Sequence, residues 1–243
     1  MRGPDGATAE WRRIARGDDV LYSIAGWPEK RDGGWTAAEF YASGSADWED
    51  FEAHWRHYAP DLGGTCVEIG CGAGRITQAL AGRFERVVAL DVSDEMIARA
   101  REACSEKVEL RRVDGPEIPL RDGEADAVFS AHVLQHLETR EAVRAYLAEA
   151  YRVLRPGATI MVHLTVASRR RSRLWRLREE ARLRVSRWRL RRGATHTAVR
   201  MRVYLPEDIF ALLDSVGFSD VELRAFAVRS NGYLHHFFLA RHN

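Results

Sequence analysis

The 243-residue sequence has few cysteines, no long hydrophobic run and almost no net charge. Its three cysteines, Cys66, Cys71 and Cys104, form no C-x-x-C pair, so the sequence indicates neither a disulfide framework nor a metal site. So few cysteines are typical of a reducing compartment. No apolar stretch reaches the length of a membrane span, and the first residues lack the apolar core of a signal peptide. We therefore expect a cytoplasmic protein without a membrane segment.

The net charge is only +2, but the basic residues are concentrated in one segment. Twelve arginines and only two acids lie between Arg169 and Arg192, so the rest of the chain is net acidic. Apolar residues recur within this segment at about 3.6-residue spacing, which predicts an amphipathic helix. These residues are Leu174, Leu177, Ala181, Val185 and Trp188. We expect an arginine-rich helical lid over residues 168–203.

Four roles for this insertion remain open. It is either a solvated lid over a site, a holder of a small anionic substrate, a contact for RNA, or a contact for a membrane surface. RNA is disfavoured because the sequence has no recognisable RNA-binding module and the near-neutral total charge gives weak long-range attraction.

Residues 1–60 are polar and rich in aromatic side chains, and we expect them to form a helical cap with a helix that starts near Asp47. From Thr65 onward, short apolar runs alternate with amphipathic segments. The predicted strands are Thr65–Ile69, Arg86–Leu90, Val108–Val113, Ala127–Ser130, Thr159–Val166, Val221–Val228 and Tyr233–Ala240. The predicted helices are Ile76–Arg83, Asp94–Ala103, Arg140–Leu154 and Pro206–Val216.

Strands that alternate with helices are typical of a parallel, doubly wound sheet. The last two predicted strands are joined by a turn at Ser230-Asn231-Gly232, which favours antiparallel pairing. The fold class is therefore α/β, with a seven-stranded, mostly parallel Rossmann-like sheet over residues 61–243 and an antiparallel closing strand.

The first predicted strand ends in a turn with glycines at three alternating positions, Gly70, Gly72 and Gly74. Glycine lets the backbone approach a ligand closely, and the N-terminus of the following helix supplies free N–H groups. In a dinucleotide-binding G-x-G-x-x-G turn the third glycine would fall on Arg75, so a nicotinamide cofactor is disfavoured. Asp91 ends the second strand, where a carboxylate can accept hydrogen bonds from both hydroxyl groups of a ribose.

Together the E-x-G-x-G-x-G run and the acid at the end of the second strand resemble the class I S-adenosylmethionine (SAM)-dependent methyltransferases, with a type 11-like pattern. The resemblance covers about residues 65–165. Further segments match the family in order, and Ala125 and Ala158 depart from its usual residues. These segments are Val113-Asp114-Gly115, Ile118–Asp122, Ala125–Val128, Val133–Leu137 and Leu154–Ala158.

The resemblance implies SAM as the cofactor and assigns residues to its parts. The glycine turn would face the methionine part, Asp91 the ribose, and Met96 and Asp114 the adenine. Phe40–Gly44 is similar to a family segment that closes over the cofactor. The expected cofactor-binding residues are Tyr41, Gly44, Glu68, Gly70, Cys71, Gly72, Gly74, Asp91, Val92, Met96, Asp114, Gly115 and Ser130.

Two histidines are candidate catalytic residues. His132 follows the fourth strand at its carboxyl end, where it would accept a proton from the acceptor or orient it. His136 lies one turn further along. His163 is expected to be a buried group with its hydrogen bonds satisfied, and His235 and His236 to alternate across a closing strand. Cys71 has no expected nucleophilic role.

The expected activity is methyl transfer from SAM to an oxygen or nitrogen of a small molecule. A specialised metabolite is the expected acceptor, and an anionic one is among the alternatives. An RNA methyltransferase that binds through the arginine-rich insertion and a SAM-binding protein without transferase activity are the alternatives.

Overall fold

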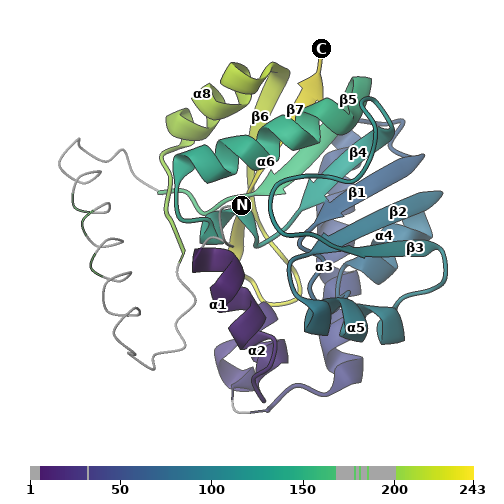
Figure 1. The fold of residues 1–243 in the computed structure, drawn as a ribbon, viewed down its shortest axis with the longest axis vertical. Coiled ribbons are helices and arrows are strands. Elements are labelled where there is room, and N and C mark those ends of the chain that lie inside the picture. The colour runs from purple at the N-terminus through teal and green to yellow at the C-terminus, as the bar shows by residue number, and fades with distance from the viewer. Residues whose placement is uncertain (1–5, 32, 168–177, 179–180, 182–184, 186–200) are drawn as a thin grey trace.

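The computed structural model describes residues 6–31, 33–167, 178, 181, 185 and 201–243. Within them, seven strands form one sheet with helices on both faces (Figure 1), in the order β3-β2-β1-β4-β5-β7-β6. β7 runs antiparallel to both of its neighbours, and the other strand pairs are parallel. The predicted Rossmann-like sheet with an antiparallel closing strand is confirmed.

The elements alternate along the chain as a doubly wound fold requires. The strands are β1 (Thr65–Ile69), β2 (Arg86–Asp91), β3 (Val108–Arg112), β4 (Ala125–Ser130), β5 (Leu154–His163), β6 (Phe218–Ala227) and β7 (Leu234–His242). The helices of the sheet domain are α4 (Thr77–Arg83), α5 (Asp94–Ala103), η2 (Leu134–His136), α6 (Arg140–Val153) and α8 (Pro206–Val216). The helices before the sheet are α1 (Gly6–Ile14), α2 (Val20–Ile24), η1 (Pro28–Lys30) and α3 (Ala37–Tyr58).

Alternate residues of each central strand belong to different cores, because successive side chains of a strand point to opposite faces. In β1, Val67 and Ile69 pack in the core that contains the apolar residues of α6 and α8. Cys66 packs on the other side with α3, α4 and Phe129 of β4. The central strands are therefore covered on both faces, and the exposed ends of the parallel strands are left for a site.

The helix predicted to start near Asp47 starts at Ala37 instead. Thr36 caps it: its side chain accepts from the backbone N–H of Glu39, and the Glu39 carboxylate accepts from the Thr36 backbone N–H. The T-x-x-E capping box therefore sets the helix start. The apolar periodicity missed the first turns, because several buried residues there are small or polar, such as Ser43 and Gly44.

The fifth strand starts earlier than predicted, at Leu154 directly after α6. Arg155-Pro156-Gly157 ends the helix as expected, but these exposed residues lie within the strand, next to a register shift opposite Ala125 and Ala127. An irregular strand start tolerates proline, which cannot donate to a ladder. The arginine-rich insertion predicted over residues 168–203 lies almost entirely outside the described residues.

Helix α3 contacts the glycine turn closely. A Cβ atom at Gly44 would lie 2.0 Å from the backbone oxygen of Arg75. One turn further along α3, Asp47 forms a buried ion pair with Arg75 at 2.7 Å. Helices α1 and α2 lie beside the carboxyl ends of the central strands (Figure 1). Among the described helices, none combines the length and the apolar surface that a membrane crossing requires.

The close approach at Gly44 leads to a stability prediction. Gly44→Ala should lower the free energy of unfolding by about 1–3 kcal/mol, because the new methyl group overlaps the Arg75 backbone. Gly82→Ala is the matched control, since Gly82 also lies in a helix but its Cβ would meet nothing within 4 Å. The control should gain up to about 1 kcal/mol from helix propensity. Urea unfolding of the two variants checks this, and equal stability would contradict the packing described.

Candidate functional site

The three glycines of the turn after β1 have two different roles. Gly70, Gly72 and Gly74 all have positive φ angles, of 78°, 54° and 84°. Added Cβ atoms at Gly70 and Gly74 would lie 2.2 Å from Val133 and 2.8 Å from Cys104. At Gly72 the nearest atom would be 3.8 Å away, on Ile24. Two of the glycines therefore permit close packing, and Gly72 leaves its backbone open for a ligand.

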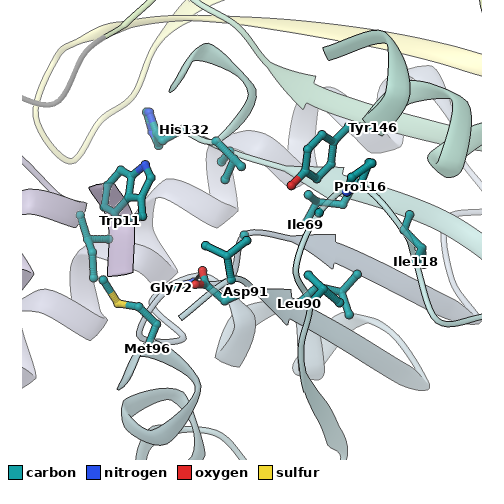
Figure 2. A pocket seen from close by; sticks show the side chains of 17 residues that line it. Trp11, Ile69, Gly72, Leu90, Asp91, Met96, Pro116, Ile118, His132 and Tyr146 are labelled. Carbon is teal, nitrogen blue, oxygen red and sulfur yellow. Dashed lines mark hydrogen bonds between the residues drawn. The ribbon is translucent and has the colours of Figure 1, made fainter. Parts of the chain in front are cut away.

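A cavity of about 730 Å³ lies beside this turn, at the carboxyl ends of β1, β2 and β4. Figure 2 shows Asp91 and Gly72 near its centre, with Trp11 and Met96 on one side and Tyr146 on the other. Most of its lining is apolar, as in typical sites for small ligands. The lining residues are Trp11, Ile24, Ile69, Gly70, Gly72, Leu90, Asp91, Val92, Met96, Val113, Gly115, Pro116, Ile118, Ala131, His132, Val133 and Tyr146.

The Asp91 carboxylate is fixed at the edge of this cavity by backbone donors. The N–H of Gly72 donates to its Oδ2 at 3.0 Å, and the N–H of Ser93 donates to its Oδ1 at 2.9 Å. Burial raises the pKa of Asp91, and these N–H groups oppose that rise because they stabilise the charged form. Each carboxylate oxygen keeps a lone pair that can accept a hydrogen bond from a ligand hydroxyl. The geometry therefore suits a diol at this point.

Five of the residues expected to bind the cofactor line this cavity along with Asp91: Gly70, Gly72, Val92, Met96 and Gly115. Met96 is positioned by the cap of α5, where the Ser93 side chain accepts from its backbone N–H. The other expected cofactor residues lie outside the lining: Tyr41, Gly44, Glu68, Cys71, Gly74, Asp114 and Ser130.

Three of the latter group are internal supports. The Thr77 hydroxyl donates to Glu68 Oε2 at 2.6 Å, and burial raises the pKa of Glu68 to about 7. The Ser130 hydroxyl donates to the backbone oxygen of Ile69 at 3.0 Å, which joins the ends of β1 and β4. Tyr41 acts similarly, because its hydroxyl donates to the backbone oxygen of Ala73 at 3.1 Å. These side chains hold the turn from behind.

The Asp114 carboxylate is largely exposed, with 68% of its side chain accessible. It pairs with Arg12 of α1 and with Arg112 of β3, and these two cations lower the pKa of Asp114. The sequence expectation placed it at the adenine. In the structure its neighbour Gly115 lines the cavity, while the Asp114 side chain points to α1.

The sequence analysis did not assign the N-terminal helix α1 to the site. Trp11 lines the cavity, and the neighbouring Arg12 donates from Nε to the backbone oxygen of Val92 at 2.8 Å. Ile24 of α2 completes this wall. An aromatic residue in a short basic helix is a weak signal, because no local spacing links it to a strand end far along the chain.

A second cavity, of about 1850 Å³, adjoins the first, and Trp11, Ile24 and His132 line both. Its other lining residues are Asp19, Tyr22, Ser23, Ala25, Gly26, Trp27, Arg31, Asp47, Arg75, Gln135, His136, Met201, Asn231, Tyr233 and His235. His132 therefore lies at the boundary. Its φ of 62° is a left-handed conformation that non-glycine residues adopt rarely, often at functional sites.

The expected histidines come together around this boundary. His136 lines the second cavity and packs edge-on against Trp11, with ring centroids 5.3 Å apart. His132 contacts His163 and His235. Burial lowers the pKa of His132 and His163 well below the usual value and that of His235 to about 4, so all three rings are neutral near pH 7.

The expectation of a satisfied His163 is wrong for the described residues, because its Nδ1 is buried and has no hydrogen-bond partner among them. His235 and His236 differ in burial as expected for neighbours on a strand, with His235 buried and His236 partly exposed.

Residues 67–162 match a family described as a methyltransferase domain. A demethylmenaquinone methyltransferase of Tropheryma whipplei is 28% identical over 118 residues, which are 46% of this chain and 48% of the relative. A malonyl-[acyl-carrier protein] O-methyltransferase of Hahella chejuensis is 36% identical over 98 residues, 39% of this chain and 34% of the relative. The chain thus matches about a third to a half of the length of these curated relatives.

The fold is also that of solved methyltransferases. The N-methyltransferase NodS of Bradyrhizobium japonicum, in complex with S-adenosyl-L-homocysteine, superimposes with a TM-score of 0.61 at 18% identity, covering 98% of this chain and 99% of NodS. The matched residues run from the first strand and the glycine turn through Asp91 to β5. Residues 67–162 therefore match the methyltransferase domain family, and the surrounding fold is that of solved methyltransferases.

Proposed function

We propose that the chain binds SAM in the smaller cavity and transfers its methyl group to an oxygen or nitrogen of a small molecule in the larger one. The observation that carries this proposal is the junction of the two cavities at His132. A methyl donor and an acceptor must meet at one point, and the backbone of Gly72 and the carboxylate of Asp91 lie in only the first cavity. The family match supports SAM as the ligand there.

In this arrangement Asp91 would hold the ribose hydroxyls, and Met96 and Trp11 would pack against flat or apolar parts of the cofactor. Methyl transfer from a sulfonium is an in-line displacement, so the main task of the protein is to align donor and acceptor and to exclude water. Trp11 and Ile24 belong to the walls of both cavities and shield the junction. A strong base is not required for a neutral amine acceptor.

His132 is the side chain best placed to orient an acceptor, because among the histidines that the structure describes it is the one that lines both cavities. Burial keeps its ring neutral, so it can accept a hydrogen bond from a hydroxyl or amine. We assign it this orienting role, and we place His136, which faces only the second cavity, further from the transferred methyl group.

The composition of the second cavity favours a small organic acceptor with an aromatic or polar part. Tyr22, Trp27 and Tyr233 contribute aromatic surface, and Arg31 contributes a cation beside Tyr22. Arg75 is already paired with Asp47, so it adds little net charge. Asp19 lines the same cavity as Arg31, so these walls fit a polar or aromatic acceptor of specialised metabolism without favouring an anion. The relatives named for demethylmenaquinone and malonyl-[acyl-carrier protein] provide the same general precedent of non-nucleic-acid acceptors.

Incubation with methyl-labelled SAM tests the proposed activity. With a panel of small hydroxylated and amine-bearing metabolites, we expect a labelled product and the demethylated cofactor in equal amounts. Labelling of RNA alone would instead support the RNA methyltransferase alternative. Tight SAM binding without any labelled product, from either the metabolite panel or RNA, would support the alternative of a SAM-binding protein without transferase activity.

Replacement of Asp91 tests the cofactor site. Asp91→Asn should weaken SAM binding about 10- to 100-fold in calorimetry, because hydrogen bonds to a charged group contribute about 1.5–3 kcal/mol. Asp114→Asn is the matched control: its exposed carboxylate lies outside the cavity, so SAM affinity should stay within about threefold. Equal losses in both variants would contradict the placement of these two acids.

Replacement of His132 tests the acceptor side. His132→Asn keeps a residue that tolerates a left-handed backbone, and it should lower kcat about 10- to 100-fold because orientation is lost. SAM affinity should change less than about threefold. His236→Asn, a partly exposed histidine outside both cavities, should keep the wild-type kcat. Unchanged kcat in His132→Asn would refute the orienting role.

A further inference from the structure

Three histidines from different strands converge on the boundary between the two cavities. His132 follows β4, His163 ends β5, and His235 lies in β7. Their ring centroids are 4.5, 5.0 and 5.1 Å apart. One ring nitrogen from each residue lies within 4.8 Å of the others. The sheet order β4-β5-β7 brings these strand ends side by side.

Three ring nitrogens of this cluster lack the hydrogen-bond partners that buried polar groups normally have. His163 Nδ1 and both nitrogens of His235 are buried and have no hydrogen-bond partner within the described part of the chain. A neutral imidazole has one donor and one acceptor, and leaving either one buried and unsatisfied is unfavourable. The side chain of His235 is thus buried with neither requirement met, and this calls for a ligand.

The spacing of the rings fits a tetrahedral metal centre. A metal–nitrogen bond of about 2.0–2.1 Å places each ring centroid about 3.2 Å from the metal, and two such rings at the tetrahedral angle lie about 5.2 Å apart. The three observed separations are close to this value. The rings are tilted against each other by 50–77°. Rings that face a common point are expected to be tilted in this way and not to be stacked.

We propose that His132, His163 and His235 together bind one divalent transition-metal ion, with Zn²⁺ the best match to three imidazoles in tetrahedral geometry. Three protein ligands leave a fourth coordination position. His132 and His235 line the second cavity, so this position faces that cavity. An oxygen donor from a small molecule or water would occupy it.

The surroundings leave the ion's charge uncompensated. Among the described residues, the charged groups that act on His132 and His235 are Asp47 and Arg75, and these two form an ion pair at 2.7 Å. Neutral imidazoles add no negative charge, so the bound ion stays a strong Lewis acid. Its role in catalysis rests on the proposed function: with the acceptor nitrogen of His132 bound to the ion, the ion in place of that nitrogen would orient the acceptor, holding its hydroxyl or carboxylate oxygen beside the methyl group and stabilising the deprotonated form of a hydroxyl.

Metal binding can be measured without SAM or an acceptor. Full-length protein without a histidine tag is treated with a chelator, desalted and titrated with Co²⁺. We expect one ion per chain and the intense visible absorption of tetrahedral Co²⁺, which an excess of Zn²⁺ abolishes. X-ray absorption of the Zn²⁺ form should show three imidazole ligands at about 2.0–2.1 Å. This measurement on the wild-type chain decides the proposal even if variants fold poorly.

Matched variants locate the ion. His163→Gln and His235→Gln should each weaken Co²⁺ binding at least tenfold, whereas His236→Gln, next to His235 but outside the cluster, should bind as the wild type does. The proposal is overturned if the folded wild-type chain shows no binding at 0.1 mM Co²⁺, roughly the weakest affinity useful to a resident ion. It is also overturned if thiolate charge-transfer bands place the ion on cysteine, or if the three variants lose affinity equally.

These results separate the metal proposal from the proposed function. An ion bound by three histidines in a chain that transfers no methyl group contradicts the proposed function and leaves the metal site intact. Full methyl transfer by chelator-treated protein that binds no Co²⁺ overturns the metal site and leaves the proposed function intact.

Discussion

The arrangement of both cavities depends on one buried ion pair, between Arg75 and Asp47. The two side chains are only 6% and 2% exposed, and their N–O distance is 2.7 Å. Asp47 also accepts from the Ser230 hydroxyl, and Arg75 also donates to Ser43. One interaction thus joins the glycine turn, helix α3 and the turn between β6 and β7. Removing one partner of such a pair costs far more than the pair contributes, because a charge is left buried alone.

This ion pair also explains why the chain has arginine where a dinucleotide-binding turn would have its third glycine. The long side chain reaches across to α3, while Gly44 lets the helix approach the Arg75 backbone. Also in α3, Asp50 accepts a hydrogen bond from the Arg229 backbone N–H and forms an ion pair with the Arg229 guanidinium. The β6–β7 turn is therefore fixed to α3 at two points, and β7 carries His235 to the cavity boundary.

The sequence predicted the sheet domain well, because the information there is local. Helix α5 and strand β1 were predicted with the residues they have, and Asp91 lies at the end of β2 as expected. Long-range features were missed. The position of Trp11 in the cavity wall depends on contacts between residues far apart in the sequence. The cluster of His132, His163 and His235 exists only because the sheet order brings three strand ends together. Periodicity and motif spacing contain neither.

The contact between α1 and the strand ends has a consequence for how the cavity is assembled. Arg12 bonds to Val92 and Asp114, which are 80 and 102 positions further along the chain. Helix α1, which precedes the other described helices along the chain, thus has a docking surface that is completed only after β3. A nascent or truncated chain that stops before Asp114 can fold neither this wall nor a closed cavity around Trp11, whatever its local helix content.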